Sequence, residues 1–401
     1  MLLATPRRQL TTAAYLALGV FGAFWGTWGA AVPRIRDQAG VDDAQLGVAL
    51  LFISAGGLPA MLLTGRALDR WGLRSTALLV VALGGAGVTA AATAGGLVSL
   101  CAGLALVGAA SGAADVAMNS VAGRAEQRSG RPVITRGGAV FSTGVVVFSL
   151  GTGAAYRLGA PTWVPFAAVL LLSVSAGAAI HRALPPDVSG PEPAAAHRGR
   201  MTIWPLLLVG ALGALAYASE NAHQSWSAVY LEDVLATEPG LSAIAPAVFA
   251  AVVAVTRLAV SVLKPAYARR VLLVGSVVAA VGAAVLARAP NVPVALAGLV
   301  LAAAGTAALF PTLLSIVSRN VAESSRGRAT AVVTVVSYLG FLLGPVYVGL
   351  WASAAGLRGA MLAVAALGVV LAVLTLPLLA LSRYAVTPQP AVRQDHPARR
   401  T

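Results

Sequence analysis

Long apolar stretches, separated by short polar segments, run through nearly the whole chain. About 20 apolar residues are enough for one helix to cross a hydrocarbon core of roughly 30 Å. Twelve such stretches can be delimited, at residues 13–32, 45–64, 75–95, 97–121, 137–156, 161–180, 201–222, 241–263, 271–288, 293–317, 329–351 and 356–381. The pattern predicts an all-α membrane protein with twelve transmembrane helices.

The basic residues are distributed unevenly over the segments between these stretches. If the N-terminus is placed inside, 22 of the 28 Lys and Arg residues fall on the inner side. Short loops rich in Lys and Arg stay in the cytoplasm, so we predict that both termini are cytoplasmic. Arg accounts for 27 of these residues and Lys264 for the other, which is typical of a high-GC bacterium. We therefore expect a multi-pass protein of the bacterial cytoplasmic (inner) membrane.

The composition excludes several classes of protein. A mean hydropathy of +0.83 with 10% charged residues is incompatible with an ordinary soluble domain. The net charge of +14 lies in short loops with no basic patch interleaved with aromatics, so we expect lipid contact and no nucleic-acid partner. No Walker motif, metal-binding pattern or nucleophile elbow occurs, and Cys101 is the single cysteine. We expect no enzyme activity, no metal and no cofactor.

A proline-rich segment divides the chain into two halves. Residues 181–200 contain four prolines among small and charged residues, which is typical of an extended linker. We predict an N-terminal six-helix bundle at residues 1–180 and a C-terminal bundle at 201–381, followed by a disordered cytoplasmic tail at 382–401. The halves echo each other weakly around their fourth and tenth stretches. This indicates a parallel repeat with a solute site between two pseudo-symmetric bundles.

The loop after the second stretch carries a spaced set of glycines and charges. Gly65, Asp69, Arg70, Gly72 and Arg74 follow the pattern G-x-x-x-D-[RK]-x-G-x-[RK]. This resembles the signature inner loop of the major facilitator superfamily. We expect the two glycines to allow close helix approach and a tight turn. Asp69 is expected to cap a helix or to pair with Arg70, in a loop that controls the conformational switch.

A closer resemblance covers most of the chain, to a poorly characterised bacterial branch related to fucose-permease-type sugar–proton symporters. It rests on Trp25–Trp28 with Pro33, on Asp43–Gly47, on Gly112–Asn119, and on Glu220 followed by Trp226–Tyr230. Three polar positions expected in that branch are absent, because Ala31, Gly138 and Ser225 replace an Arg, a His and an acid. The resemblance therefore implies a mechanism class and does not identify the solute.

Asp115 is the sharpest candidate for chemistry. It lies nine residues before Arg124, about 14 Å along the helix and near the middle of the bilayer. An ionised carboxylate there costs several kcal/mol, so it should face a cavity, carry a proton or be paired. Asn119 lies on the same helical face and matches, with Asp115, the acid and Asn that take part in proton coupling in the fucose-permease type. The alternative is a structural acid bound to a neighbouring helix.

The seventh stretch ends in an unusually polar segment, residues 219–227. We expect a broken helix that lines the outer part of a cavity, because lipid would leave these polar groups unsatisfied. Glu220 would face that cavity, Trp226 could stack on a sugar-like ring, and His223 would be a hydrogen-bonded wall residue. The alternative is that the outer loop begins near Glu220.

Three further side chains could line the same cavity. Arg257 lies about 10 Å inside the inner boundary, where it either snorkels to the headgroups or contacts an anion or an acid in the cavity. Trp25 and Trp28 lie three residues apart on one helical face. They form either a stacking wall or ordinary packing aromatics.

These features predict a secondary active transporter that moves a small polar, sugar-like solute across the membrane, coupled to protons through Asp115. The expected partners are the solute, the proton and the lipid bilayer, and we expect a monomer. Proton-driven efflux of a drug or self-made metabolite is one alternative. A Gly-Pro ending on the fifth stretch, common in such exporters, is missing here. A second alternative is a membrane sensor or scaffold that does not transport.

Overall fold

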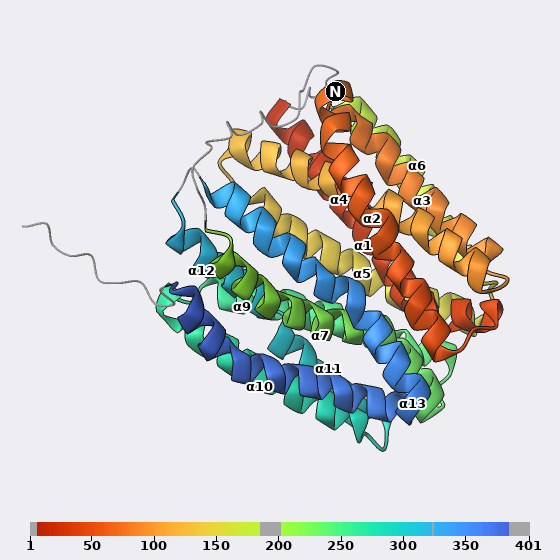
Figure 1. Ribbon diagram of the computed structural model, residues 1–401. Coiled ribbons are helices and arrows are strands. Elements are labelled where there is room, and N and C mark those ends of the chain that lie inside the picture. The colour runs from red at the N-terminus through yellow and green to blue at the C-terminus, as the bar shows by residue number, and fades with distance from the viewer. Residues whose placement is uncertain (1–5, 185–201, 323–324, 385–401) are drawn as a thin grey trace, which may run out of the picture.

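The structure of the protein is a computed structural model that describes residues 6–184, 202–322 and 325–384. These residues form thirteen α-helices and two short 3-10 turns, with no β-strand in the ranges described (Figure 1). The helices are α1 (Pro6–Ala39), α2 (Asp43–Trp71), α3 (Thr76–Thr93), α4 (Leu97–Ser129), α5 (Val133–Arg157), α6 (Val164–Ala183), α7 (Trp204–Leu235), α8 (Pro239–Ser242), α9 (Ile244–Ser261), α10 (Ala268–Ala287), α11 (Val292–Thr306), α12 (Leu309–Asn320) and α13 (Arg326–Ser382).

The helices agree with twelve membrane crossings. Ten helical segments in the described chain are long and apolar enough to span a bilayer, one of them joining α11 and α12. The helix α7 is not among these ten, but its 32 residues are long enough to cross and it packs along α13. The 57-residue α13 would be about 85 Å long if straight, far more than a bilayer needs. Gly356 interrupts it with φ 69° and ψ 169°, so α13 supplies two crossings.

Several predicted boundaries are corrected. The tenth stretch, predicted as one helix, is split between α11 and α12. The seventh helix is continuous from Trp204 to Leu235, so both the broken helix and the loop beginning near Glu220 are wrong. Of the predicted linker, residues 181–183 belong to α6 and residues 185–200 lie outside the described residues. Most of the predicted tail, residues 385–401, also lies outside them.

Within each half, glycines allow the corresponding pair of helices to pack closely. A Cβ atom on Gly22 of α1 would collide with the backbone of Phe141 on α5. A Cβ on Gly340 of α13 would likewise collide with the backbone of Ala214 on α7. Small residues let helices approach closely where lipid supplies no hydrophobic drive between them. The first and fifth crossings therefore pack as the seventh and eleventh do, as expected for pseudo-symmetric bundles.

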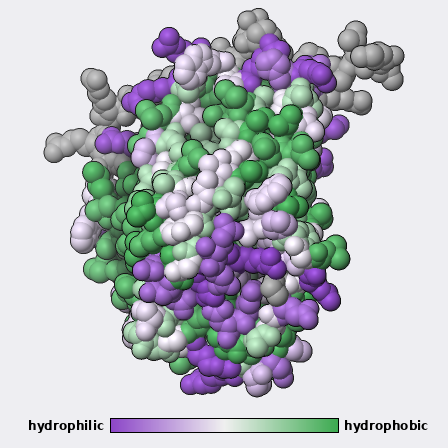
Figure 2. Space-filling view, turned by 90° about the vertical axis from the view of Figure 1, so that its right-hand side faces the viewer, coloured by the Kyte–Doolittle hydropathy of each residue, from purple (hydrophilic) through white to green (hydrophobic). Residues whose placement is uncertain are grey.

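The two ends of the molecule differ in charge. One end holds the start of α1 and the arginine-bearing ends of α2, α4 and α6, and we name it the basic end. The far end holds the end of α1, the start of α2 and the end of α7. Apolar side chains cover the flanks between hydrophilic groups that gather toward the top and in the lower half of the view in Figure 2. This distribution is what a helix bundle embedded in a bilayer requires.

The predicted charged loop is in fact the last turns of α2 and the turn into α3, and it has only part of the expected structure. Gly72 adopts φ 72° and closes α2 through its N–H to the Leu68 carbonyl, so the tight turn is confirmed. A Cβ on Gly65 would meet no atom within 4 Å, so close helix approach there is wrong. Asp69 is exposed, and the described chain provides it with neither the expected helix cap nor an ion pair.

Candidate functional site

A large cavity lies between the two halves of the molecule. Its volume is about 940 Å³, and helices of both bundles line it. Its wall reaches Thr135 at the start of α5, Lys264 just after α9 and Arg319 near the end of α12. All three positions belong to the basic end, so the cavity extends to that end of the molecule.

The far end is closed by contacts between the halves. Arg36 at the end of α1 donates from Nη2 to Oδ1 of Asp233 on α7 at 2.9 Å, and its Nη1 also contacts Asp233. The same guanidinium bonds Asp43 of α2 and Asp37 of its own helix, both at 3.1 Å. Nearby, Ser149 of α5 is fully buried and donates to the Ala243 carbonyl just before α9 at 2.8 Å. We refer to Arg36, Asp37, Asp43 and Asp233 as the far-end cluster.

The N-terminal half contributes an aromatic wall. Phe21, Trp25, Trp28 and Phe141 line the cavity. The ring of Phe21 lies 6.2 Å from that of Trp25 and 5.9 Å from that of Phe141. Trp28 is almost completely buried in the apolar core and, like Trp25, still lines the cavity. This wall suits the apolar face of a small solute.

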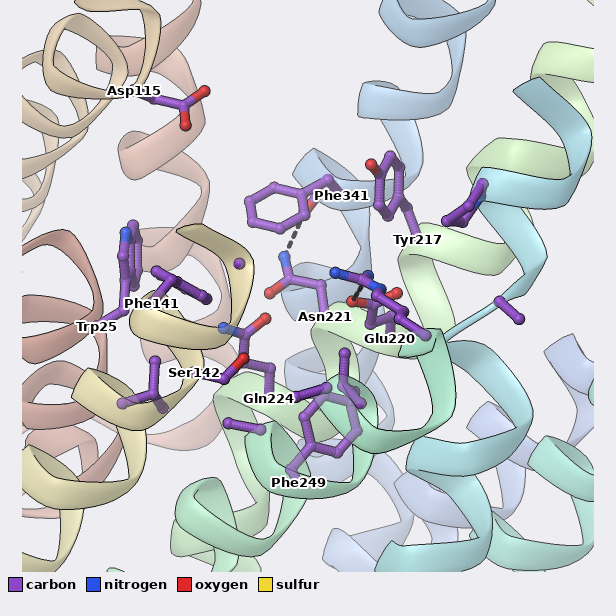
Figure 3. A pocket seen from close by; sticks show the side chains of 18 of the residues that line it. Trp25, Asp115, Phe141, Ser142, Tyr217, Glu220, Asn221, Gln224, Phe249 and Phe341 are labelled. Carbon is purple, nitrogen blue, oxygen red and sulfur yellow. Dashed lines mark hydrogen bonds and ion pairs between the residues drawn. The ribbon is translucent and has the colours of Figure 1, made fainter. Parts of the chain in front are cut away.

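Asp115 is the charged side chain that α4 presents to this cavity. Figure 3 shows it directed into the space between the bundles. Asn119 donates from Nδ2 to Asp115 Oδ1 at 3.0 Å, and Asn119 itself is not among the lining residues. In the described chain no cation lies within ion-pair distance of this carboxylate. The two residues are in contact as predicted, and Asn119 supports the Asp115 carboxylate from outside the cavity wall.

The C-terminal half contributes most of the polar groups. Glu220 accepts a hydrogen bond at 3.0 Å from Nη2 of Arg257 on α9, whose Nε donates to the Ala307 carbonyl at 3.0 Å. Arg257 therefore faces the cavity as the partner of an acid and does not snorkel away from it. Asn221 donates to the Phe341 carbonyl at 2.6 Å and accepts from Ser225 at 3.0 Å (Figure 3).

Two predicted wall residues lie elsewhere. Trp226 is completely buried in the apolar core and does not line the cavity, so it cannot stack on a solute in this conformation. His223 is also completely buried, with Nδ1 donating to the Ser219 carbonyl at 2.7 Å. Its ring stacks on Phe249 at 6.2 Å, and Phe249 rather than His223 lines the cavity.

Sequence reasoning did not single out several residues that line the cavity. Tyr217, Asn221 and Gln224 line it from α7, and Tyr338 lines it from α13. On α7 the positions 217, 220 or 221, and 224 follow each other at intervals of three or four residues, which is the spacing of one helical face. That spacing would have separated them from Trp226, which points the other way.

The three positions that depart from the fucose-permease pattern are not equivalent. Gly138 and Ser225 line the cavity, whereas Ala31 is completely buried. A Cβ on Gly138 would meet no atom within 4 Å. The absence of the expected His therefore leaves open space in the wall.

The sequence matches the model of the Major Facilitator Superfamily over residues 14–265 and 264–400. An uncharacterised transporter of Sinorhizobium fredii, y4wD, is 30% identical over 88% of this chain and 94% of its own length. An uncharacterised MFS-type transporter of Yersinia pestis is 30% identical over 83% of this chain and 86% of its own.

Solved structures show the same fold. The nucleoside transporter NupG aligns with a TM-score of 0.71 over 95% of this chain and 100% of its own, at 14% identity. A D-xylose–proton symporter aligns with a TM-score of 0.75 over 91% of this chain and 96% of its own, at 15% identity. The chain belongs to the Major Facilitator Superfamily and is a multi-pass membrane transporter, not an enzyme.

Proposed function

We propose that this member of the superfamily is a secondary active transporter of a small polar, sugar-like solute, coupled to protons through Asp115. The observation that carries the proposal is a carboxylate in a cavity between the two bundles, with no cation partner among the described residues. A proton bound there would neutralise the Asp115 carboxylate and could be released when the other end opens.

We further propose that the basic end is cytoplasmic, so that the structure is open to the inside and closed by the far-end cluster. The excess of Lys and Arg at the basic end supports this orientation. Each bundle would move as a unit, and rocking would alternately open the two ends. An impermeant maleimide on intact cells should label a cysteine at Asp43 and not one at Ser189, in a Cys101→Ala background. Labelling at Ser189 alone would reverse the orientation.

The coupling is tested with purified protein in proteoliposomes. A thermal-shift screen of sugars, polyols, nucleosides and amphipathic drugs first supplies a solute for transport measurements. Asp115→Asn removes this titrating group, so accumulation driven by a pH gradient should fall well below that of the wild type while solute exchange persists. Glu238→Gln is the matched control, because Glu238 is an exposed carboxylate outside the cavity. Undiminished pH-driven accumulation by Asp115→Asn would refute the assignment.

The same measurement separates the alternatives. Proton-driven efflux predicts that solute moves against the inward proton gradient, with the opposite sign of pH dependence. A sensor or scaffold predicts binding without any exchange.

A further inference from the structure

The environment of Arg257 leaves part of its guanidinium accessible. Two of its hydrogen bonds are to the Ala307 carbonyl and to one oxygen of Glu220, each at 3.0 Å. An arginine has five N–H donors, and a carboxylate that fits it fully binds with both oxygens. The Arg257 side chain is 45% exposed, whereas that of Glu220 is 14% exposed. A second anionic group could therefore reach Arg257 from the cavity.

The remaining charges of the cavity favour such an anion. Its charged lining consists of Arg257, Lys264 and Arg319 against Asp115 and Glu220. The three cations all belong to the C-terminal half, and Lys264 and Arg319 lie where the cavity reaches the basic end. Positive groups along a cleft raise the local concentration of anions and guide them inward. The facing aromatic wall contributes no charge.

We propose that the solute is a small organic carboxylate with an apolar face, whose carboxylate binds Arg257 in place of Glu220. This inference deepens the proposed function, since it assumes that the solute is carried in this cavity. Glu220 takes up one proton as the solute displaces it, and no other bond is made or broken. Anion and proton then enter together, so the net charge of the cavity is unchanged. This matters because an uncompensated charge in a nonpolar site is strongly unfavourable.

Other groups around the pair can also titrate or attract ions. Asp115 of α4, Tyr338 of α13 and Tyr217 of the same α7 line the cavity, and Arg319 of α12 contributes a fixed charge. His223, one turn from Glu220, is completely buried and faces Phe249 of α9. Asp115 is the other carboxylate in the cavity, so the measurements on Glu220 are repeated in an Asp115→Asn background.

The test compares paired probes that differ in charge, benzoate with benzamide and glucuronate with glucose. Binding to the purified protein is followed through tryptophan fluorescence, because Trp25 and Trp28 line the cavity. Glu220→Gln removes the acid that pairs with Arg257. At pH 8 this variant should bind at least one carboxylate about tenfold more tightly than it binds the neutral partner of that probe. It should also bind that carboxylate about tenfold more tightly than the wild type does. Arg257→Gln should lose this preference, and Arg157→Gln, which removes an exposed arginine outside the cavity, should not change it.

A second measurement needs no change at Arg257. Carboxylate affinity of the Asp115→Asn protein should rise as the pH is lowered from 8 through the titration of Glu220, because protonation of Glu220 releases its partner. In Asp115→Asn/Glu220→Gln the affinity should be independent of pH over that range. The inference is overturned if Glu220→Gln binds no carboxylate, or if neutral probes bind as tightly as their carboxylates. Transport of a neutral solute with no carboxylate binding would refute this inference alone, whereas carboxylate binding without transport would refute only the proposed function.

Discussion

The far-end cluster should control how often the molecule opens at that end. Arg36 joins α1 to Asp233 of α7, and this bond can exist only while the two bundles are in contact there. Asp233→Asn keeps the shape of the side chain and removes its charge. The equilibrium should therefore shift toward the conformation that is open at the far end.

The magnitude follows from the exposure of the partners. Fully exposed ion pairs contribute about 0–1 kcal/mol, and hydrogen bonds to charged groups contribute about 1.5–3 kcal/mol when desolvated. The Arg36 side chain is 13% exposed and that of Asp233 is 31% exposed, which places this contact between the two cases. We expect a shift of about 1–2 kcal/mol, or roughly 5- to 30-fold in the equilibrium constant.

The assay uses Ser149, which is completely buried against Ala243 while the far end is closed. A cysteine there, in a Cys101→Ala background, should react with an impermeant maleimide only when the far end opens. Asp233→Asn should raise the labelling rate by the factor above. Asp37→Asn is the matched control, because Asp37 contacts the same guanidinium from the same helix and is 60% exposed. Equal effects of the two substitutions, or no effect of Asp233→Asn, would refute the reasoning.

Two other features lead to predictions with separate measurements. Asp69→Asn should lower the transport rate and leave equilibrium solute affinity within a few-fold, since a charge in the last turn of α2, outside the cavity, biases the conformational equilibrium alone; a large loss of affinity would contradict this. Gly340→Ala should lower the thermal unfolding midpoint, by a destabilisation of about 1–3 kcal/mol, because the added Cβ collides with the backbone of Ala214. Gly65→Ala lies within α2 and meets open space, so it should not lower the midpoint, and equal shifts for the two variants would rule out the packing argument.

Hydropathy and charge were sufficient to predict the fold class. Apolar stretches long enough to cross a bilayer impose helices, because backbone polar groups have no other partners in lipid. This physical constraint is local, so it can be read from one sequence. The turn at Gly72 was predictable for a similar reason, since a positive φ favours glycine. The same rule said nothing about Gly65, where the space around the residue depends on distant helices.

The candidate site was predicted in part. Asp115 and Asn119 lie four residues apart on one helix, so their contact follows from helical geometry. Glu220 and Arg257 lie 37 residues apart in the chain and on different helices. The sequence therefore left open whether Arg257 points to the lipid headgroups or to the cavity. The predicted break in α7 was wrong, because Glu220 and Asn221 find hydrogen-bond partners on α9 and α13 while the helix stays continuous.

The all-helical fold class, the apolar stretches that cross the membrane and the acid within the fourth of them could all be predicted from the sequence. These properties depend on the transfer of each segment from water to lipid, which is a sum over its own residues. Spacing along α7 shows which residues share a face, but the tertiary arrangement was needed to show that the face of Gln224 lines the cavity and that Trp226 enters the core. It also decided that Arg36 and Asp233, 197 residues apart, close one end of the molecule. Both depend on how whole helices pack against each other, and no single segment of the chain contains that information.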